Sequence, residues 1–134
     1  DVTLSDGERS RVQKALALLH HRGPDETKIV QIGAQAVLGH TRLATFQRDA
    51  NHQPAISSDG TVHVVFNGQI YNHSSLGSGS AEEGVCIADA IEQEGVAALP
   101  TFDGPFALAA YSAHSGELLL ARDRFGEKPL FYAK

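Results

Sequence analysis

The stretch Phe66-Asn67-Gly68-Gln69-Ile70-Tyr71-Asn72-His73 decides how this chain is interpreted. An apolar, partly β-branched run from Thr61 to Phe66 precedes it and predicts a strand that leads into it. Asn-Gly is the strongest short-range hairpin signal, so Asn67-Gly68 taken alone predicts a plain turn. Glycine also lets the main chain approach a ligand closely. The stretch therefore fits two descriptions, a turn and the wall of a binding site.

The composition is typical of a soluble globular domain, with 134 residues of which 42% are hydrophobic and 20% charged. A net charge of -5 argues against a nucleic-acid or anionic-membrane surface. No apolar run approaches the roughly 20 residues that span a bilayer. The single cysteine, Cys86, cannot form an internal disulfide, which predicts a reducing, cytoplasmic location. The absence of methionine indicates a processed or trimmed chain.

Apolar spacing predicts two helices. Ser5-Asp6-Gly7-Glu8 has the form of a capping box, and Gly23-Pro24 ends the helix that follows. The residues expected to face inward from this helix are Val12, Ala15, Leu16 and Leu19. A second helix is predicted over Glu82–Gln93, before Gly95. Its inward residues are expected to be Val85, Ala88 and Ile91.

Strands are predicted at Ile29–Ile32, Ala36–His40, Thr61–Phe66 and Leu130–Tyr132, with a hairpin made by Phe106–Ala113 and Glu117–Arg122. These strands cluster along the chain with few helices between them. That order favours an α+β fold with antiparallel sheets over a doubly wound parallel sheet.

Five motifs then occur in a fixed order along the chain. They are His21-Arg22-Gly23-Pro24-Asp25, Leu38-Gly39-His40-Thr41-Arg42-Leu43-Ala44, His52-Gln53-Pro54, Asn67-Gly68-Gln69-Ile70-Tyr71-Asn72-His73 and Ala121-Arg122-Asp123-Arg124-Phe125-Gly126-Glu127-Lys128-Pro129-Leu130. Together they resemble the glutaminase domain of asparagine synthetase, a class II glutamine amidotransferase. The resemblance covers nearly the whole chain. It implies one glutaminase-like domain over residues 1–134, trimmed at both ends.

The fold implied by the resemblance is the four-layer αββα sandwich of N-terminal-nucleophile hydrolases. Its first strand is expected to be absent, because the first helix cap begins within a few residues of Asp1. The implied reaction converts L-glutamine to glutamate and ammonia, which a C-terminal ATP-dependent synthetase domain of the same polypeptide then uses. No metal or cofactor is expected in this domain, and ATP and Mg²⁺ are expected only in the synthetase domain. The resemblance leaves open whether the protein is a homodimer.

The resemblance also implies the site residues. The oxyanion hole maps to the Asn67 side chain and the Gly68 N–H, beside Gln69, where the family more often has glutamate. Arg42 matches the residue that holds the substrate α-carboxylate, which suits the fork of a guanidinium. The residues expected to offer main-chain contacts to the substrate are Leu43, Ala44, Thr45 and Phe46. His40 is interpreted as structural, since this mechanism needs no histidine base.

An acid for the substrate α-ammonium is expected just before the second helix. Counting back from Gly95 places Glu83 there, beside Glu82, whereas counting from Gly79-Ser80 places Ala81 there and loses the acid. We favour Glu83. The alternative is that Glu82 and Glu83 are first-turn acids favoured by the helix dipole.

Three features depart from the family pattern. The segment Gly77–Ser80 has the composition of a flexible linker, natural or engineered. Asp1 is not the expected N-terminal cysteine, and Cys86 reads as a small buried apolar residue within a helix. The chain also lacks an ATP-binding phosphate loop. Two functions remain: the glutaminase domain of an asparagine synthetase-like enzyme, and a catalytically silent glutaminase-like scaffold of an ATP-dependent amide ligase.

Overall fold

A computed structural model of the chain describes residues 6–44 and 52–133. The chain divides into two compact units, residues 1–54 (unit 1) and residues 55–134 (unit 2). In each unit, a helix packs on an antiparallel sheet.

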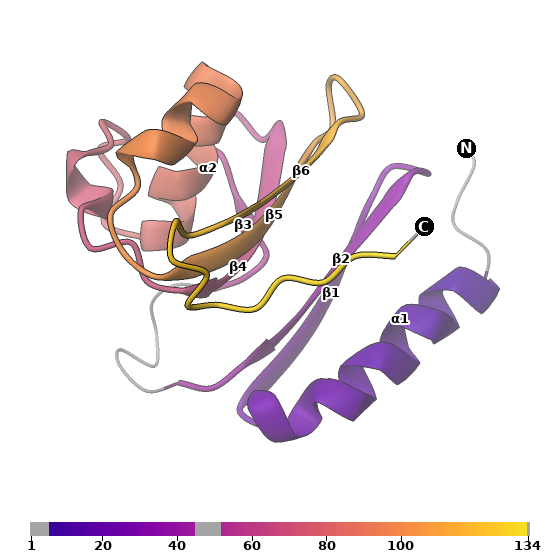
Figure 1. The fold of residues 1–134 in the computed structure, drawn as a ribbon. Helices are drawn as coiled ribbons and strands as arrows, with labels where there is room; N and C mark the ends of the chain where they lie inside the picture. The colour runs from indigo at the N-terminus through magenta and orange to yellow at the C-terminus, as the bar shows by residue number, and fades with distance from the viewer. Residues whose placement is uncertain (1–5, 45–51, 134) are drawn as a thin grey trace. The chain divides into compact units, whose positions relative to one another are not determined.

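Unit 1 consists of helix α1 (Asp6–Leu19), the 3₁₀ turn η1 (His20–Arg22) and a hairpin of β1 (Glu26–Ile32) and β2 (Ala36–Arg42). Figure 1 shows α1 running along this hairpin. The contact is made by Leu16, which is buried. A Cβ atom on Gly39 of β2 would lie 2.8 Å from Leu16 Cδ1, so the glycine allows the helix to approach the strand closely.

The predicted inner face of α1 is partly wrong. Leu16 is buried and Val12 half-buried, but Ala15 is exposed and Leu19 is 49% exposed. The hairpin is narrow, so only one row of the helix reaches it. The expected cap at Ser5 lies outside the described residues, and α1 ends at Leu19, four residues before Gly23.

Unit 2 is built on a four-stranded antiparallel sheet in the order β3-β4-β5-β6. The strands are β3 (Ala55–Ile56), β4 (Val62–Gly68), β5 (Phe106–Ser112) and β6 (Leu118–Arg122). Between β4 and β5 the chain forms η2 (His73–Ser75), helix α2 (Glu83–Glu94) and η3 (Gly95–Thr101). The hydrophobic core lies between α2 and the sheet, and its largest fully buried side chains are Val64, Ile70, Ile87 and Leu108.

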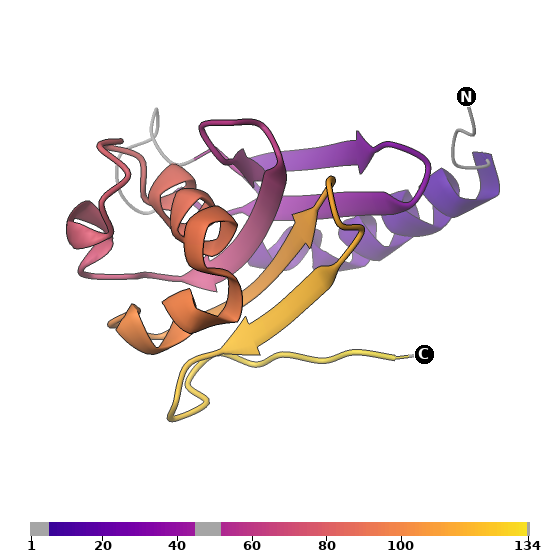
Figure 2. The same cartoon turned by 90° about the horizontal axis from the view of Figure 1, so that it is seen from above.

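Most of the elements predicted in unit 2 are confirmed. Helix α2 begins at Glu83 and stops at Gly95, which has φ +59°. Its predicted inward residues Ala88 and Ile91 are buried, and Val85 is half-buried. Figure 2 shows β5 and β6 as the expected hairpin. The two-residue strand β3 was not predicted.

The predicted strand at Leu130–Tyr132 is wrong. Residues 130–132 belong to no helix or strand, and Figure 2 shows this segment continuing past β6 as irregular chain. Pro129 has no N–H to donate to a neighbouring strand. Phe131 and Tyr132 are exposed, so no buried side chain stabilises a strand here.

The corner before this segment is made by turn chemistry, as expected. The carboxylate of Asp123 accepts hydrogen bonds from the main-chain N–H groups of Phe125, Glu127 and Lys128 at 3.0–3.1 Å. The bond from Glu127, with those from Lys128 and Phe125, lowers the pKa of this carboxyl against the effect of burial.

The α+β class is confirmed. Each unit supplies a helix layer and an antiparallel sheet layer, consistent with the N-terminal-nucleophile sandwich.

Candidate functional site

At its C-terminal end, β4 directs the main-chain N–H of Gly68 toward the side of the strand that faces β3. Ser57 N–H bonds to Val62 O on the β3 side of β4, whereas Gln69 N–H bonds to Pro105 O on the β5 side. Because main-chain groups alternate along an antiparallel strand, even-numbered residues of β4 point toward β3. The N–H of Gly68 therefore points to that side. Within residues 52–133, β3 pairs with β4 at Val64 and His63.

Gly68 is also required by the fold. Its φ is +126°, a value that favours glycine, and a Cβ atom there would lie 2.0 Å from Pro105 O. The glycine thus permits the main chain to cross Pro105 closely. Asn67 precedes it, is exposed, and lies opposite Ala107 of β5.

Glu83 reaches the same end of β4 from the first turn of α2. Its Oε1 accepts a short hydrogen bond from Ile70 N–H, two residues beyond Gly68. Glu83 is buried, whereas Glu82 and Ala81 are exposed. Burial raises the pKa of Glu83, and the bond from Ile70 and the nearby His73 only partly offset this. Of the alternatives raised by the sequence, the structure places Glu83 beside the Asn67–His73 stretch.

The second half of that stretch holds the loop together. Asn72 donates from Nδ2 to Thr101 O at 2.8 Å and accepts from Asp103 N–H at 3.0 Å. His73 Nδ1 lies 3.0 Å from Ile70 O. These residues therefore support the segment that carries Asn67 to Ile70.

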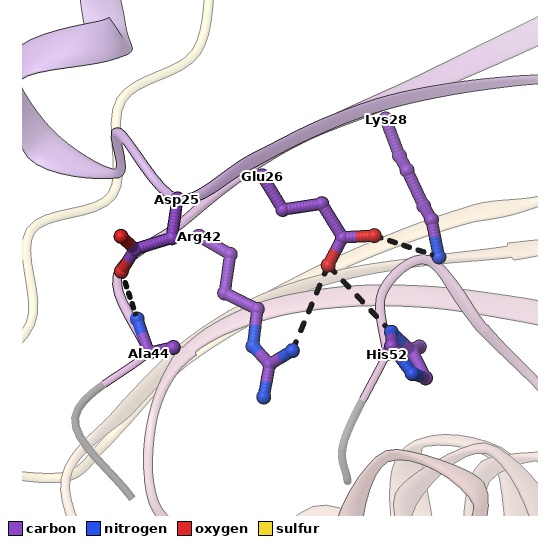
Figure 3. A network of polar contacts seen from close by, with 6 residues as sticks. All are labelled: Asp25, Glu26, Lys28, Arg42, Ala44 and His52. Atoms are coloured by element: carbon purple, nitrogen blue, oxygen red, sulfur yellow. Dashed lines mark hydrogen bonds and ion pairs between the residues drawn. The ribbon is translucent and has the colours of Figure 1, made fainter. Parts of the chain in front are cut away.

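Arg42 lies at the end of β2 in unit 1, directly opposite Glu26 of β1. Its Nη1 is 3.6 Å from Glu26 Oε2, and its side chain is 11% exposed (Figure 3). Glu26 also contacts Lys28 and His52. The sequence did not indicate Glu26, because no local motif marks a residue paired across a hairpin.

Asp25 fixes the chain that follows Arg42. Its N–H bonds to Arg42 O at 3.0 Å, and its Oδ2 accepts Ala44 N–H at 2.7 Å (Figure 3). A Cβ atom on Gly23 would lie 2.4 Å from the Thr41 main chain, so Gly23 lets this turn close on β2. Leu43 is exposed in this segment, and Thr45 and Phe46 lie outside the described residues.

The sequence profile of the glutamine amidotransferase domain matches residues 2–134. The chain belongs to this family. It is 32% identical to an asparagine synthetase (glutamine-hydrolysing) of Brassica oleracea, over 95% of this chain and 23% of that protein. It is 34% identical to a probable asparagine synthetase (glutamine-hydrolysing) of Dictyostelium discoideum, over 89% of this chain and 24% of that protein. A Bacillus subtilis asparagine synthetase (glutamine-hydrolysing) is 28% identical over 87% of this chain and 16% of its own length. The chain thus spans about a quarter or less of these relatives.

In this amidotransferase domain, Arg42 belongs to unit 1, whereas Asn67, Gly68, Gln69 and Glu83 belong to unit 2. The structure gathers the latter four at the end of β4. Their convergence with Arg42 on one ligand stays a prediction.

The segment Gly77–Ser80 is held by specific hydrogen bonds. Ser78 Oγ donates to Asp89 of α2, and Ser80 Oγ accepts Glu82 N–H at 3.0 Å. Gly77 and Gly79 take φ values of +82° and +73°. The linker-like composition therefore forms a defined entry to α2, immediately before Glu83.

Cys86 is buried in α2, as the sequence predicted. Its Sγ lies 3.3 Å from Ser80 O, and burial raises the pKa of the thiol. A buried thiol with a raised pKa is a poor nucleophile.

Among the described residues, no helix is long and apolar enough to cross a membrane. The same part of the chain contains no group of three or more residues suited to hold a metal.

Proposed function

We propose that this domain binds L-glutamine at the end of β4 and releases ammonia from the side-chain amide of the glutamine. The ammonia is supplied to an ATP-dependent amide-forming domain of a longer polypeptide. The hydrolysis converts glutamine and water into glutamate and ammonia. The observation that carries the proposal is the hydrogen bond that joins the Glu83 carboxylate to Ile70, because it brings an acid to the strand that carries Asn67 and Gly68.

The proposed oxyanion hole consists of the Asn67 side-chain amide and the Gly68 N–H. When a nucleophile attacks the substrate amide, negative charge develops on its carbonyl oxygen. Donors already aimed at that oxygen stabilise the transition state more than the ground state. The Gly68 N–H suits this role, since it points to a side of β4 where the paired part of β3 has ended.

The two ends of the amino acid would be recognised by opposite charges. Arg42 would hold the α-carboxylate through its guanidinium. Glu83 would attract the α-ammonium, and Leu43 to Phe46 and Gln69 would complete the wall of the site. Because Glu83 already accepts the Ile70 N–H, its position is fixed before a ligand binds.

The nucleophile is assigned to a residue other than Cys86, because that thiol is buried. The relatives are longer chains whose printed names describe glutamine-hydrolysing synthetases. In the proposal, ATP and Mg²⁺ belong to the synthetase part, which also consumes the ammonia. The location is proposed to be the cytoplasm.

A second candidate function follows from the burial of Cys86. A domain without a reactive thiol would bind glutamine, or only shape its neighbour, without hydrolysing it. Assaying ammonia release from glutamine by the full-length protein separates the two candidates, since the silent domain would release none.

The binding part of the proposal is tested by calorimetric titration of glutamine into the full chain. Arg42→Ala should weaken binding by about tenfold or more, because a charge-assisted, bidentate contact is lost. Arg9→Ala, an exposed arginine on α1, is the matched control and should bind as the unmodified chain does. Saturable glutamine binding whose affinity is unchanged by Arg42→Ala would contradict the assignment of Arg42 to the carboxylate site.

A further inference from the structure

The carboxylate of Glu26 is shared among three basic side chains (Figure 3). Its Oε1 lies 2.9 Å from Lys28 Nζ. Its Oε2 lies 3.6 Å from Arg42 Nη1 and 3.6 Å from His52 Nδ1. The two oxygens thus serve different partners, and the closest of these is Lys28.

The strand register explains why these groups meet. Glu26 is paired with Arg42, and Lys28 with His40, so the four side chains lie on one face of the hairpin. Leu16 of α1 packs against Gly39, on the opposite face. The face that carries Arg42 is therefore the one turned away from the helix.

The side-chain carboxylate of Glu26 is the same functional group as the α-carboxylate of an amino-acid ligand. An arginine binds a carboxylate most strongly when two parallel N–H donors meet both oxygens. In the structure, Glu26 Oε1 lies 2.9 Å from Lys28 Nζ, which is hydrogen-bond distance. Glu26 Oε2 lies 3.6 Å from Arg42 Nη1, which is 0.7 Å longer. Glu26 consequently does not form a fork-to-fork pair with the guanidinium.

We propose that Lys28 is a positioning residue for ligand binding: by holding Glu26, it prevents this internal carboxylate from occupying the Arg42 guanidinium. The proposal rests on the function given above for Arg42. It makes Glu26 a competitor of the ligand carboxylate and Lys28 the group that restrains the competitor.

The surrounding charges agree with this arrangement. The hydrogen bond from Lys28 lowers the pKa of Glu26, so this residue is anionic near neutral pH. Burial lowers the pKa of His40; the Glu26 charge opposes this, whereas Arg42 and Lys28 add to it. Asp25, whose N–H bonds to Arg42 O, has its Oδ2 bonded to Ala44 N–H.

The test is a set of glutamine titrations of the full chain at alkaline pH, where imidazole side chains ordinarily carry little charge. Lys28→Gln should weaken glutamine binding by roughly three- to tenfold, because Glu26 is released toward Arg42. Lys28→Arg should bind within about twofold of the unmodified chain, since the restraining charge is kept. Lys14→Gln, at an exposed position of α1, controls for the loss of a positive charge.

The double variant Lys28→Gln/Glu26→Gln distinguishes this role from a structural one. Removing the competitor should restore binding to within about twofold of the unmodified chain, a non-additive result that shared structural damage would not produce. Lys28→Gln binding as tightly as the unmodified chain, or a double variant as weak as Lys28→Gln, would overturn the inference. If Arg42→Ala also left binding unchanged, the proposed role of Arg42 would fall with it.

Discussion

The main-chain N–H of Ile70 donates a hydrogen bond to the carboxylate of Glu83, which follows it by 13 residues. The contact joins the loop after β4 to the first turn of α2. Glu83 is 6% exposed, so burial disfavours its charged form, and the bond from Ile70 N–H offsets part of that cost. The position of an acid beside Asn67 and Gly68 is thus set by a tertiary contact.

Glu83→Gln is expected to separate stability from binding. Glutamine keeps an oxygen that accepts the Ile70 N–H but removes a buried charge. We therefore expect unchanged or increased thermal stability at neutral pH. Glutamine affinity should fall by about tenfold or more, because the substrate ammonium loses its anionic partner. Thermal melts and calorimetric titrations of the same samples measure both effects. Reduced stability with intact binding would contradict this role for Glu83.

The pH dependence of unfolding should report the same carboxyl. Its pKa is raised in the folded state, so folding favours the protonated form. This contribution to the free energy of unfolding is fully present below the unfolded-state pKa. It is lost as the pH rises through the folded-state pKa. Between the ordinary glutamate pKa of 4.5 and the folded-state pKa, the excess stability of Glu83→Gln over the unmodified chain should therefore grow with pH. A difference that shrinks with pH would show that the pKa is not raised.

Gly68 and Asn67 should respond differently to alanine. Gly68→Ala places a Cβ atom against Pro105 O at a φ of +126°, so we expect a loss of roughly 1–3 kcal/mol or more in the free energy of unfolding. Asn67 is exposed, so Asn67→Ala should change stability by about 0.5 kcal/mol or less. In a full-length protein that hydrolyses glutamine, Asn67→Ala should lower kcat by about 10²–10³-fold with little change in KM. Denaturant melts and ammonia-release kinetics provide the two measurements.

Local signals in the sequence were sufficient where one short segment determines the structure. The Gly95 stop of α2 and the β5–β6 hairpin follow from nearest-neighbour backbone preferences. The Leu130–Tyr132 prediction failed because strand propensity cannot supply a partner strand. Glu26 escaped notice for a related reason: its importance comes from the register that sets it opposite Arg42. Counting along the sequence favoured Glu83 over Ala81, but its contact with Ile70 N–H depends on the fold of the loop after β4.

The carboxylate of Asp89 should stabilise the folded chain fully only at pH values above its unfolded-state pKa. It is buried on α2 and accepts bonds from Ser58 N–H at 2.6 Å and from the hydroxyls of Ser58 and Ser78. Burial alone would raise the pKa of Asp89, but these hydrogen bonds outweigh it and lower the pKa. Stability from this group is therefore present above the unfolded-state pKa and lost as the pH falls through the folded-state pKa. Asp89→Ala should cost about 1–3 kcal/mol at neutral pH, because buried donors lose their acceptor.

The control for Asp89 is Glu92→Ala, an exposed acid on the same helix, which should cost less than about 0.5 kcal/mol. Urea melts at neutral and acidic pH measure both variants. Equal effects of the two substitutions would show that the bonds to Ser58 and Ser78 do not stabilise the domain.

Cys86 should behave as a core residue. Its side chain is 1% exposed, and burial and the nearby Asp89 and Glu83 charges raise the pKa of the thiol, against the hydrogen bond from Ser78. An alkylating reagent should therefore react slowly with the folded chain and rapidly in denaturant. In the full-length protein, Cys86→Ala should leave ammonia release within about twofold of the unmodified rate, since the thiol takes no part in the proposed chemistry. A folded Cys86→Ala variant that binds glutamine but no longer releases ammonia would identify Cys86 as the nucleophile and overturn its structural role.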